Sequence, residues 1–515
     1  MVGLASTLFI RENFVKLFFL SSILFISLFA DTSLAQQTSI AAAPAQQTQT
    51  RPEYKVPFVN KKLANGLEVI VLPDSSIPIV TVELGVRNGS FTEPIEFNGL
   101  SHLYEHMFFK PNSASLLFQC QRAMLTGPLN AFGQSMCREP LRLRSQIGDA
   151  SYVLDLDKAG ITRNGTTQEE YVNYFFTTTS GHLPMIMRFM RDSALYPTFT
   201  EDELRQEIQV VLGELDQQEA QPFYYLDRKL MDMLFYKYPS RKRPGGTRET
   251  VAAATAEKMR LIHSRYYVPN NSSLIVTGDV QPEQVFKLAE ELFGGWEKGE
   301  DPFVKFPIVE HPPLEESMGV IVNQDVENVI VQIGWHGPSI GKDDAATYAA
   351  DVFSFIVEQP DSKFQRAMID SGLAVSASVH YYTQRNTGPI RITLITSPAK
   401  AKAAAAELYK QIGQFNSPNY FSNEELDTAK NLLEAEDLLR REKLSEYTHT
   451  LGFWWSSTGI DYFRGYHRNL RAVSRNDIGK YLTTYILGKP HVAVALVSAS
   501  AQAAAGLTEA DLLGK

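Results

Sequence analysis

The sequence predicts an α+β protein made of two homologous halves, each with an antiparallel or mixed sheet packed against helices. Three observations support this fold class. From Tyr54 onward, short runs of β-favouring residues alternate with amphipathic helical stretches. The same order of elements starts again after residue 315, which indicates duplicated domains rather than a short repeat. Finally, 44% of the 515 residues are hydrophobic and 21% are charged, a composition typical of globular proteins with sizeable cores.

The chain begins with the features of an export signal. Two basic residues precede an apolar run over residues 17–30, and Ser33-Leu-Ala35 resembles a cleavage site. The run is short for a membrane span, which needs about 20 apolar residues. We therefore expect a signal peptide over 1–35, a secreted or periplasmic bacterial protein and no stable membrane span after cleavage. An uncleaved anchor is the alternative. Residues 36–53, rich in Ala, Gln and Thr, are predicted to form a flexible leader.

The first half is predicted to span residues 54–296. Its strand-like runs, rich in β-branched residues, are Leu67–Pro73, Ile79–Val86 and Ser272–Gly278. Its helices are expected over Gly99–Phe109, from Thr200 onward and over Pro282–Phe293. Thr200 is predicted to cap its helix, because a Glu follows it three residues later.

The second half is predicted to span residues 316–515. Residues 297–315, rich in Pro, Gly and charge, are expected to be the linker between the halves. Two strand-like runs of the second half parallel runs of the first: Asn328–Ser339 is similar to Ile79–Ser90, and His491–Ser498 is similar to Ser273–Gly278.

One motif carries chemistry. The predicted helix over Gly99–Phe109 contains the pattern H-x-x-E-H, in which His102 and His106 are four residues apart and share one helix face. Two imidazoles and a carboxylate suit a zinc ion and leave a fourth position for water. Glu105 is close enough to hold that water and accept its proton. The pattern therefore predicts a hydrolytic zinc site, and two surface histidines on a helix are the alternative.

The third ligand is expected from the helix that follows Phe199. Glu207 and Glu214 are seven residues apart, so that both lie on one face of this helix. We assign Glu214 as the third ligand of one Zn²⁺ per chain, and Glu207 as the carboxylate that orients a ligand histidine. Two solvated carboxylates would be the preferred interpretation if the H-x-x-E-H motif were absent.

These motifs resemble the insulinase/pitrilysin family of zinc peptidases, over residues 54–500. The resemblance implies an insulinase-type fold and hydrolysis of peptide bonds, with Glu105 as the base and His102, His106 and Glu214 as the zinc ligands. It also places Asn164 on an edge strand that binds the substrate backbone by strand addition. Further matching segments are Asn164-Gly-Thr-Thr, Tyr267-Val-Pro-Asn-Asn-Ser, Ser371-Gly-Leu-Ala-Val and Leu451-Gly-Phe-Trp-Trp.

The spacing departs from the family pattern in the first half. Glu214 lies 108 positions beyond His106, roughly 30 more than the family spacing, which indicates an insertion at about residues 111–160. Cys120 and Cys137 lie inside this insertion. Either they form a disulfide in an oxidising compartment or they are two reduced, buried thiols. The insertion is expected to act either as a lid or as a surface that binds a partner.

The second half departs from the motif itself. The positions equivalent to the three motif residues fall near Asp351, Ser354 and Phe355, so this half is not expected to bind metal. Short family members pair to enclose substrate, which implies a homodimer or a heterodimer with a related subunit. Family members often hold the substrate carbonyl with an Arg and a Tyr. Here Val375 replaces the Tyr, and Arg366 is a candidate at a poorly matching spacing.

The expected function is that of an exported zinc metalloendopeptidase that hydrolyses peptides or unfolded polypeptide segments. The alternative is a catalytically silent or partner-dependent subunit of the same family. Nucleic acid is excluded as the main partner, because the net charge is −9 and no dense basic run occurs. The sequence also contains no phosphate-binding Gly-rich loop.

Overall fold

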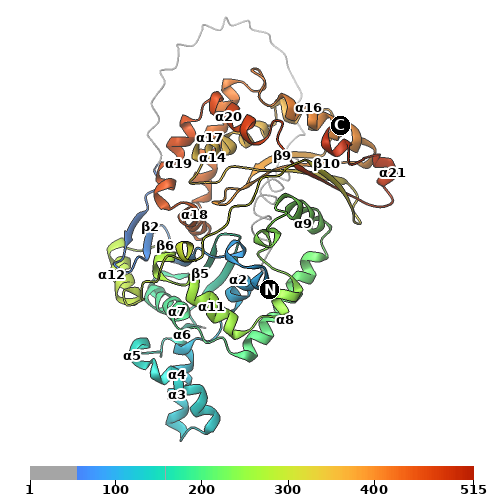
Figure 1. Ribbon diagram of the computed structural model, residues 1–515. Helices are drawn as coiled ribbons and strands as arrows, with labels where there is room; N and C mark the ends of the chain where they lie inside the picture. Colours follow the sequence, from blue (N-terminus) through green and yellow to red (C-terminus); the bar gives the residue numbers. More distant parts are fainter. Residues whose placement is uncertain (1–54, 157) are drawn as a thin grey trace, which may run out of the picture. The chain divides into compact units, whose positions relative to one another are not determined.

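The computed structural model describes residues 55–156 and 158–515. The predicted signal peptide and leader, residues 1–35 and 36–53, lie outside the described residues. Residues Val56–Lys515 form one compact unit that contains two β-sheets covered by helices (Figure 1). Within the described ranges, no helix is long and apolar enough to cross a bilayer.

The two sheets have the same topology. The strand order β2-β6-β3-β5-β4 of the first sheet corresponds to β7-β11-β8-β10-β9 of the second, and the first sheet adds β1 beside β2. In both sheets one pair is parallel, β2 with β6 and β7 with β11, and the other pairs are antiparallel. This confirms two homologous halves with mixed sheets. The strands are β1 (Val59–Lys62), β2 (Glu68–Pro73), β3 (Ile79–Val86), β4 (Thr162–Thr167), β5 (Val172–Thr179), β6 (Ser272–Gly278), β7 (Met318–Asn323), β8 (Val329–His336), β9 (Ser376–Tyr381), β10 (Pro389–Thr396) and β11 (Val492–Val497).

Helices cover both faces of each sheet, which explains why the central strands are apolar almost throughout. In the first half, α2, α7, α11 and α12 share one core with the inner residues of the first sheet. In the second half, α14, α16, α17 and α20 do the same for the second sheet. The longer helices are α2 (Leu100–Phe108), α7 (Leu183–Leu195), α8 (Glu201–Glu219), α9 (Pro222–Leu234), α11 (Ala256–Tyr266), α12 (Pro282–Phe293), α14 (Asp344–Val357), α16 (Ala401–Gln414), α17 (Asn423–Arg440), α18 (Leu444–Ser457), α19 (Ile460–Ala472) and α20 (Arg475–Tyr485).

Each half contributes one helix that packs on the sheet of the other half. Helix α9 of the first half packs its leucines, among them Leu230, against β11 of the second sheet. Helix α18 of the second half packs Trp455 against β2 and β6 of the first sheet. The Arg87 guanidinium lies 4.1 Å from the Trp455 ring and donates a 2.9 Å hydrogen bond to the Trp455 carbonyl. Each half therefore completes the core of the other.

Helix α8 begins where the sequence predicts, but its cap differs. Thr200 is the N-cap residue, yet its hydroxyl makes no hydrogen bond to the backbone of the first turn. It donates instead to Oε2 of Glu203 at 2.7 Å. Thr200 is thus the N-cap residue that the sequence predicts, but its hydroxyl bonds the Glu203 carboxylate and not a backbone amide.

The segment predicted as an insertion is helical. It contains α3 (Ser113–Thr126), α4 (Ala131–Arg142), α5 (Arg144–Ile147) and α6 (Val153–Leu156). A disulfide between Cys120 and Cys137 joins α3 to α4. The segment predicted as a linker holds only one short helix, α13 (Pro302–Lys305).

Candidate metal centre

Helix α2 carries the H-x-x-E-H motif and is fixed at its N-terminus by a buried carboxylate. Oε1 of Glu93 accepts from the Ser101 amide at 2.6 Å, and Oε2 accepts from the Gly99 amide at 2.8 Å. These bonds satisfy amides that lack partners within the helix. Gly99 has a φ of 88°, and a Cβ there would lie 2.7 Å from the carbonyl oxygen of Gly245. Only glycine suits this helix start.

The buried face of α2 packs on aromatic rings. The Tyr104 ring stacks on Tyr267 with 4.1 Å between centroids, and Phe108 stacks on Tyr174 at 3.7 Å. Leu100 and Leu103 are fully buried in the same core. This packing fixes the direction in which the polar residues of α2 point.

Helix α8 brings Glu214 to the two histidines of α2. Oε2 of Glu214 lies 3.5 Å from Nε2 of His102 and 3.6 Å from Nε2 of His106. Ligand atoms bound to one tetrahedral zinc ion at about 2.1 Å are separated by about 3.4 Å. The donor set therefore fits a zinc ion. Oε2 of Glu214 is also buried and makes no hydrogen bond to any described residue, as expected of an atom reserved for a cation.

Glu207 lies behind one of these histidines. Its Oε2 is 3.1 Å from Nδ1 of His106, and its Oε1 is 2.5 Å from Nζ of Lys110. Histidine ligands commonly donate their second ring N–H to a carboxylate in this way. Glu207 thus orients the Nε2 atom of His106 toward Glu214, while Lys110 holds Glu207. The corresponding Nδ1 atom of His102 has no hydrogen-bond partner among the described residues.

Strand β4 lies directly against Glu105. The Thr167 hydroxyl donates to Oε2 of Glu105 at 2.7 Å. A Cβ at Gly165 would lie 2.6 Å from Cγ of Glu105, so no larger residue fits there. Burial raises the pKa of Glu105 to about 7, although the Thr167 bond opposes this shift. A carboxyl with a pKa near neutrality suits a group that accepts and returns a proton.

The two histidines differ in charge. Burial and the nearby His106 lower the pKa of His102 to about 3, so its ring is neutral at pH 7. Burial alone would lower the pKa of His106, but the hydrogen bond with Glu207 and the negative charge of the nearby Glu214 carboxylate outweigh it and raise this pKa to about 9. Without a metal ion, the cluster therefore holds a proton between its carboxylates. The same negative surroundings favour a metal cation.

The sheet ends at β4, close to this cluster. β4 pairs with β5 on one side only, and Asn164 lies opposite Phe175 in this antiparallel ladder. Side chains alternate along a strand, so Asn164 lies on the opposite face from Gly165 and Thr167. The strand thus has Glu105 on one face and a row of unpaired backbone groups along its outer edge.

The second half has no equivalent cluster. Among the described residues, His102, His106 and Glu214 form the single group that brings three potential metal ligands within reach of one ion. Asp351 and Ser354 lie on α14, and Oδ2 of Asp351 accepts a hydrogen bond from the Tyr466 hydroxyl at 2.6 Å. These polar groups of α14 are used within the fold.

Arg366 and Val375 lie on the surface of the second half. Arg366 begins a π-helical turn, Arg366–Asp370, and its nearest carboxylate oxygen, in Asp361, is 3.9 Å away. No contact within the described ranges joins Arg366 to the metal-ligand cluster. The Val375 residue is 70% exposed. The structure therefore does not bring either residue into the site of the same chain.

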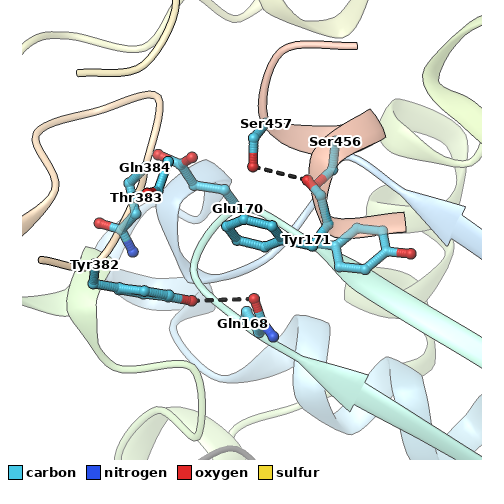
Figure 2. A pocket seen from close by; sticks show the side chains of 9 residues that line it. Gln168, Glu170, Tyr171, Tyr382, Thr383, Gln384, Ser456 and Ser457 are labelled. Atoms are coloured by element: carbon cyan, nitrogen blue, oxygen red, sulfur yellow. Dashed lines mark hydrogen bonds between the residues drawn. The ribbon is translucent and has the colours of Figure 1, made fainter. Parts of the chain in front are cut away.

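The second half contacts the first at the turn that follows β4. The Tyr382 hydroxyl points at Gln168 and donates to its Oε1 atom at 3.1 Å (Figure 2). The Glu170 carboxylate accepts from the backbone amides of Arg385 and Asn386 at 2.8 and 2.9 Å. Between these segments lies a cavity of about 10 Å³. It has room for one water molecule and is too small for a substrate side chain, so this contact fixes the β4–β5 turn rather than binding a ligand.

Sequence reasoning missed three residues of this region. Thr167, Lys110 and Glu93 all contact the motif or its helix, yet none follows a spacing rule. Thr167 and Lys110 stand within segments that match the family, Asn164-Gly-Thr-Thr and Gly99–Lys110. Only the structure reveals which atoms they contact.

Comparison with known proteins agrees with the fold. The family model described as "Insulinase (Peptidase family M16)" matches residues 69–133 and 145–243, and the one described as "Peptidase M16 inactive domain" matches residues 253–433. The break between the first two stretches, residues 134–144, falls inside the segment predicted as an insertion, within α4 and α5.

Relatives are found in bacteria. The chain is 24% identical to an uncharacterized zinc protease of Rickettsia felis, over 78% of this chain and 88% of the relative. The crystal structure of a protease from Helicobacter pylori matches with a TM-score of 0.69 at 20% identity, covering 86% of this chain and 100% of that one. The periplasmic protease PqqL from Escherichia coli matches with a TM-score of 0.65 at 15% identity, covering 90% of this chain and 50% of that one.

The two family models lie one after the other and together match more than half of the chain. The first lies within the first half, and the second runs from α11 of the first half into the second half. The fold is shared with the H. pylori protease over its whole length and with half of the longer E. coli protease. The chain belongs to the insulinase family, peptidase family M16.

Proposed function

We propose that this chain is an exported, zinc-dependent endopeptidase that cleaves peptides and unfolded polypeptide segments. One observation carries the proposal. Nε2 of His102 and Nε2 of His106 lie 3.5 and 3.6 Å from the same Glu214 oxygen, the separation that ligands of one zinc ion require. The R. felis relative is named a zinc protease, which supports the choice of metal.

Each residue of the cluster has a chemical role in this proposal. His102, His106 and Glu214 would hold the ion, which when bound acidifies a water molecule and polarises a peptide carbonyl. Glu105 accepts the proton of the attacking water and returns it to the leaving nitrogen. The Thr167 hydroxyl holds the Glu105 carboxylate in place, 2.7 Å away. Glu207 accepts the Nδ1 proton of His106 and keeps that ring in one orientation.

The outer edge of β4 would bind the substrate. An extended peptide adds to an open sheet edge through main-chain hydrogen bonds, which depend little on the side chains of the peptide. We assign Asn164 to this substrate-binding strand. Folded proteins rarely offer an extended segment with free backbone groups, so the edge would select peptides and unfolded segments.

Export rests on the N-terminal sequence. Residues 1–35 have the order of a signal peptide, with basic residues, an apolar run and a small-residue cleavage site. The similar E. coli protease is described as periplasmic, which supports the same compartment. A disulfide in the insertion also suits an oxidising compartment.

The active form is proposed to be a pair of chains, either two copies or this chain with a related subunit. The second half presents no metal cluster of its own, and the chain matches only half of the longer E. coli protease. Arg366 and Val375, both exposed, are then available to a substrate bound between two chains.

A second candidate is a subunit that is silent alone. Val375 stands where the family pattern has a tyrosine, and residues 253–433 match a model described as inactive. In this case the partner would complete the support of the substrate carbonyl.

The test combines metal content with cleavage of a mixed fluorogenic peptide library. Zinc at about one per chain and cleavage that is lost in Glu105→Gln would support the endopeptidase. The exposed Glu201 on α8 gives the matched control Glu201→Gln, which should behave as the wild type. Bound zinc without any cleavage would favour the partner-dependent subunit. A chain that binds no metal would contradict both the ligand assignment and the proposed activity.

A further inference from the structure

The insertion that follows the metal-site helix projects away from the rest of the described chain. Figure 1 shows α3, α4 and α5 together at the lower end, beyond α6 and α7. At its base, Ala114, Leu117 and Ile147 form a small core of their own. The Cys120–Cys137 disulfide ties α3 to α4, so the hairpin made by these two helices is held as one element.

The far end of this hairpin is apolar and exposed. We call Met124, Leu125, Phe132 and Met136 the hairpin tip. Leu125 is 87% exposed and Phe132 is 75% exposed, while the two methionines are 42% and 40% exposed. Large apolar side chains gathered at one exposed place usually mark an interaction site.

The same hairpin is basic, in contrast to the chain as a whole. Residues 113–142, which are α3, α4 and the turn between them, contain three arginines and one glutamate, a net charge of +2, whereas the whole chain has a net charge of −9. The glutamate, Glu139, pairs with Arg142. Arg122 and Arg138 are both exposed and form no ion pair with a carboxylate among the described residues.

We propose that the hairpin tip binds the surface of an anionic membrane. Helices that lie in the membrane interface combine large apolar side chains with arginine or lysine, and anionic lipids attract the cations. Leu125 and Phe132 would enter the boundary between headgroups and acyl chains. Arg122 and Arg138, which lie in the stretch around the tip, would face the lipid phosphates.

A second copy of this chain fits the tip less well. A stable protein interface takes about 20–30 residues from each partner. The stretch from Gln121 to Arg138 that surrounds the tip has only 18 residues, and it projects rather than forming a broad face. A membrane accepts a small projecting element, because lipids adapt to its shape.

The position of the hairpin gives membrane binding a consequence. Helix α3 begins at Ser113, five residues after α2 ends at Phe108. A tip bound to lipid would therefore hold the metal-site helix near the membrane surface. The proposal itself does not depend on peptidase activity, and binding to lipid is measured without it.

The experiment is sedimentation with vesicles, using residues 36–515, which keep the whole compact unit from Val56 to Lys515. The predicted signal peptide is absent, so its apolar run cannot bind the vesicles. Vesicles of phosphatidylglycerol and phosphatidylethanolamine in equal parts are compared with phosphatidylcholine alone. We expect binding to the anionic vesicles, weakened by salt, and much weaker binding to phosphatidylcholine.

Two sets of variants identify the tip. The double variant Leu125→Ser/Phe132→Ser should bind about tenfold more weakly, and the double variant Arg122→Gln/Arg138→Gln about 30-fold more weakly. The matched control is Ile95→Ser, since Ile95 is also exposed, at 71%, but lies outside the insertion. All these side chains are on the surface, and equal circular dichroism and thermal midpoints show that the variants fold.

Two results would overturn the proposal. One is that the wild type does not bind the anionic vesicles, or that the tip variants bind them as well as the control. The other is that the wild type forms a concentration-dependent dimer in the absence of lipid and the double variant does not, which would make a second copy the occupant of the tip.

Discussion

The two halves have the same sheet order but differ at one helix. Helix α2 follows β3 in the first half and presents His102, Glu105 and His106, while α14 follows β8 and is filled with Ala349, Phe353 and other apolar residues. His102 and Glu105 are only 5% and 8% exposed. Burying such groups costs stability, and the second half forms the same sheet without them. The comparison shows that this sheet order forms without these groups, and buried ionisable groups that a fold does not require are candidates for a functional site.

The largest effect should come from a paired substitution at equivalent positions of the two helices. Glu105→Gln should lower kcat/KM by about 1,000-fold, because it removes the proton acceptor. Ser354→Ala changes the corresponding position of α14 and should leave kcat/KM unchanged. Steady-state kinetics on one peptide compares the two, with zinc content as the control for folding of the site. Equal losses in both variants would remove the distinction between the halves.

Zinc affinity should depend steeply on pH. The pKa of His106 is raised to about 9 in the chain without metal, so the ring carries a proton below that pH. Zinc must displace this proton, and its apparent affinity should fall as the pH is lowered, by about tenfold per unit and about 100-fold from pH 8.5 to 6.5. Competition with a chelator measures this dependence. An affinity that stays constant over the range would show that His106 is not a ligand.

The carboxylate behind His106 should have a smaller effect. Glu207→Gln keeps the shape but removes the charge held between His106 and Lys110, and should weaken zinc binding by about 10–100-fold. The fold should tolerate the change, since the hydrogen bonds to Nδ1 of His106 and Nζ of Lys110 are its main contacts. Isothermal titration with zinc measures the loss. An unchanged zinc affinity would place Glu207 outside the metal site.

The smallest effect is expected at Thr167. Thr167→Val removes the hydroxyl that donates to Glu105 and should lower kcat by roughly tenfold with KM unchanged. Loss of this bond also raises the pKa of Glu105, so the acidic limb of the pH–rate profile should move to higher pH. Thr166→Val is the control, because Thr166 lies on the other face of β4. A loss of kcat without a shifted pH profile would indicate a structural role alone.

Much of the fold could be predicted because the signals are local. The β-branched residues of β2, β3 and β6 predict the boundaries of these strands to within one residue. For β3 and β6, both predicted boundaries agree with the structure. The duplication was visible only in strand-like runs, yet both sheets follow it. The exchange of α9 and α18 could not be predicted, because an apolar helix face does not state which sheet it covers.

The candidate site also has features that the sequence predicts and features that it does not. The spacing of His102 and His106 is fixed by one helix and was readable. The proximity of Glu214 to these histidines depends on the packing of α8 on α2. Its role as the third ligand is predicted from its spacing to Glu207 beside the motif, and the family resemblance implies the same role. The roles of Thr167 and Lys110 depend on side-chain contacts between separate elements, for which sequence spacing has no rule. The disulfide between Cys120 and Cys137 was one of two open alternatives, and the structure contains it.

The central claim is that the first half, and not the second, binds one zinc ion through His102, His106 and Glu214. The most direct test is the zinc content of the purified wild type and of Glu214→Ala, measured by mass spectrometry, with Glu201→Ala on the same helix as the control. The account predicts about one zinc per chain in the wild type and the control, and almost none in Glu214→Ala. Full zinc content in Glu214→Ala, or two zinc ions per wild-type chain, would contradict it.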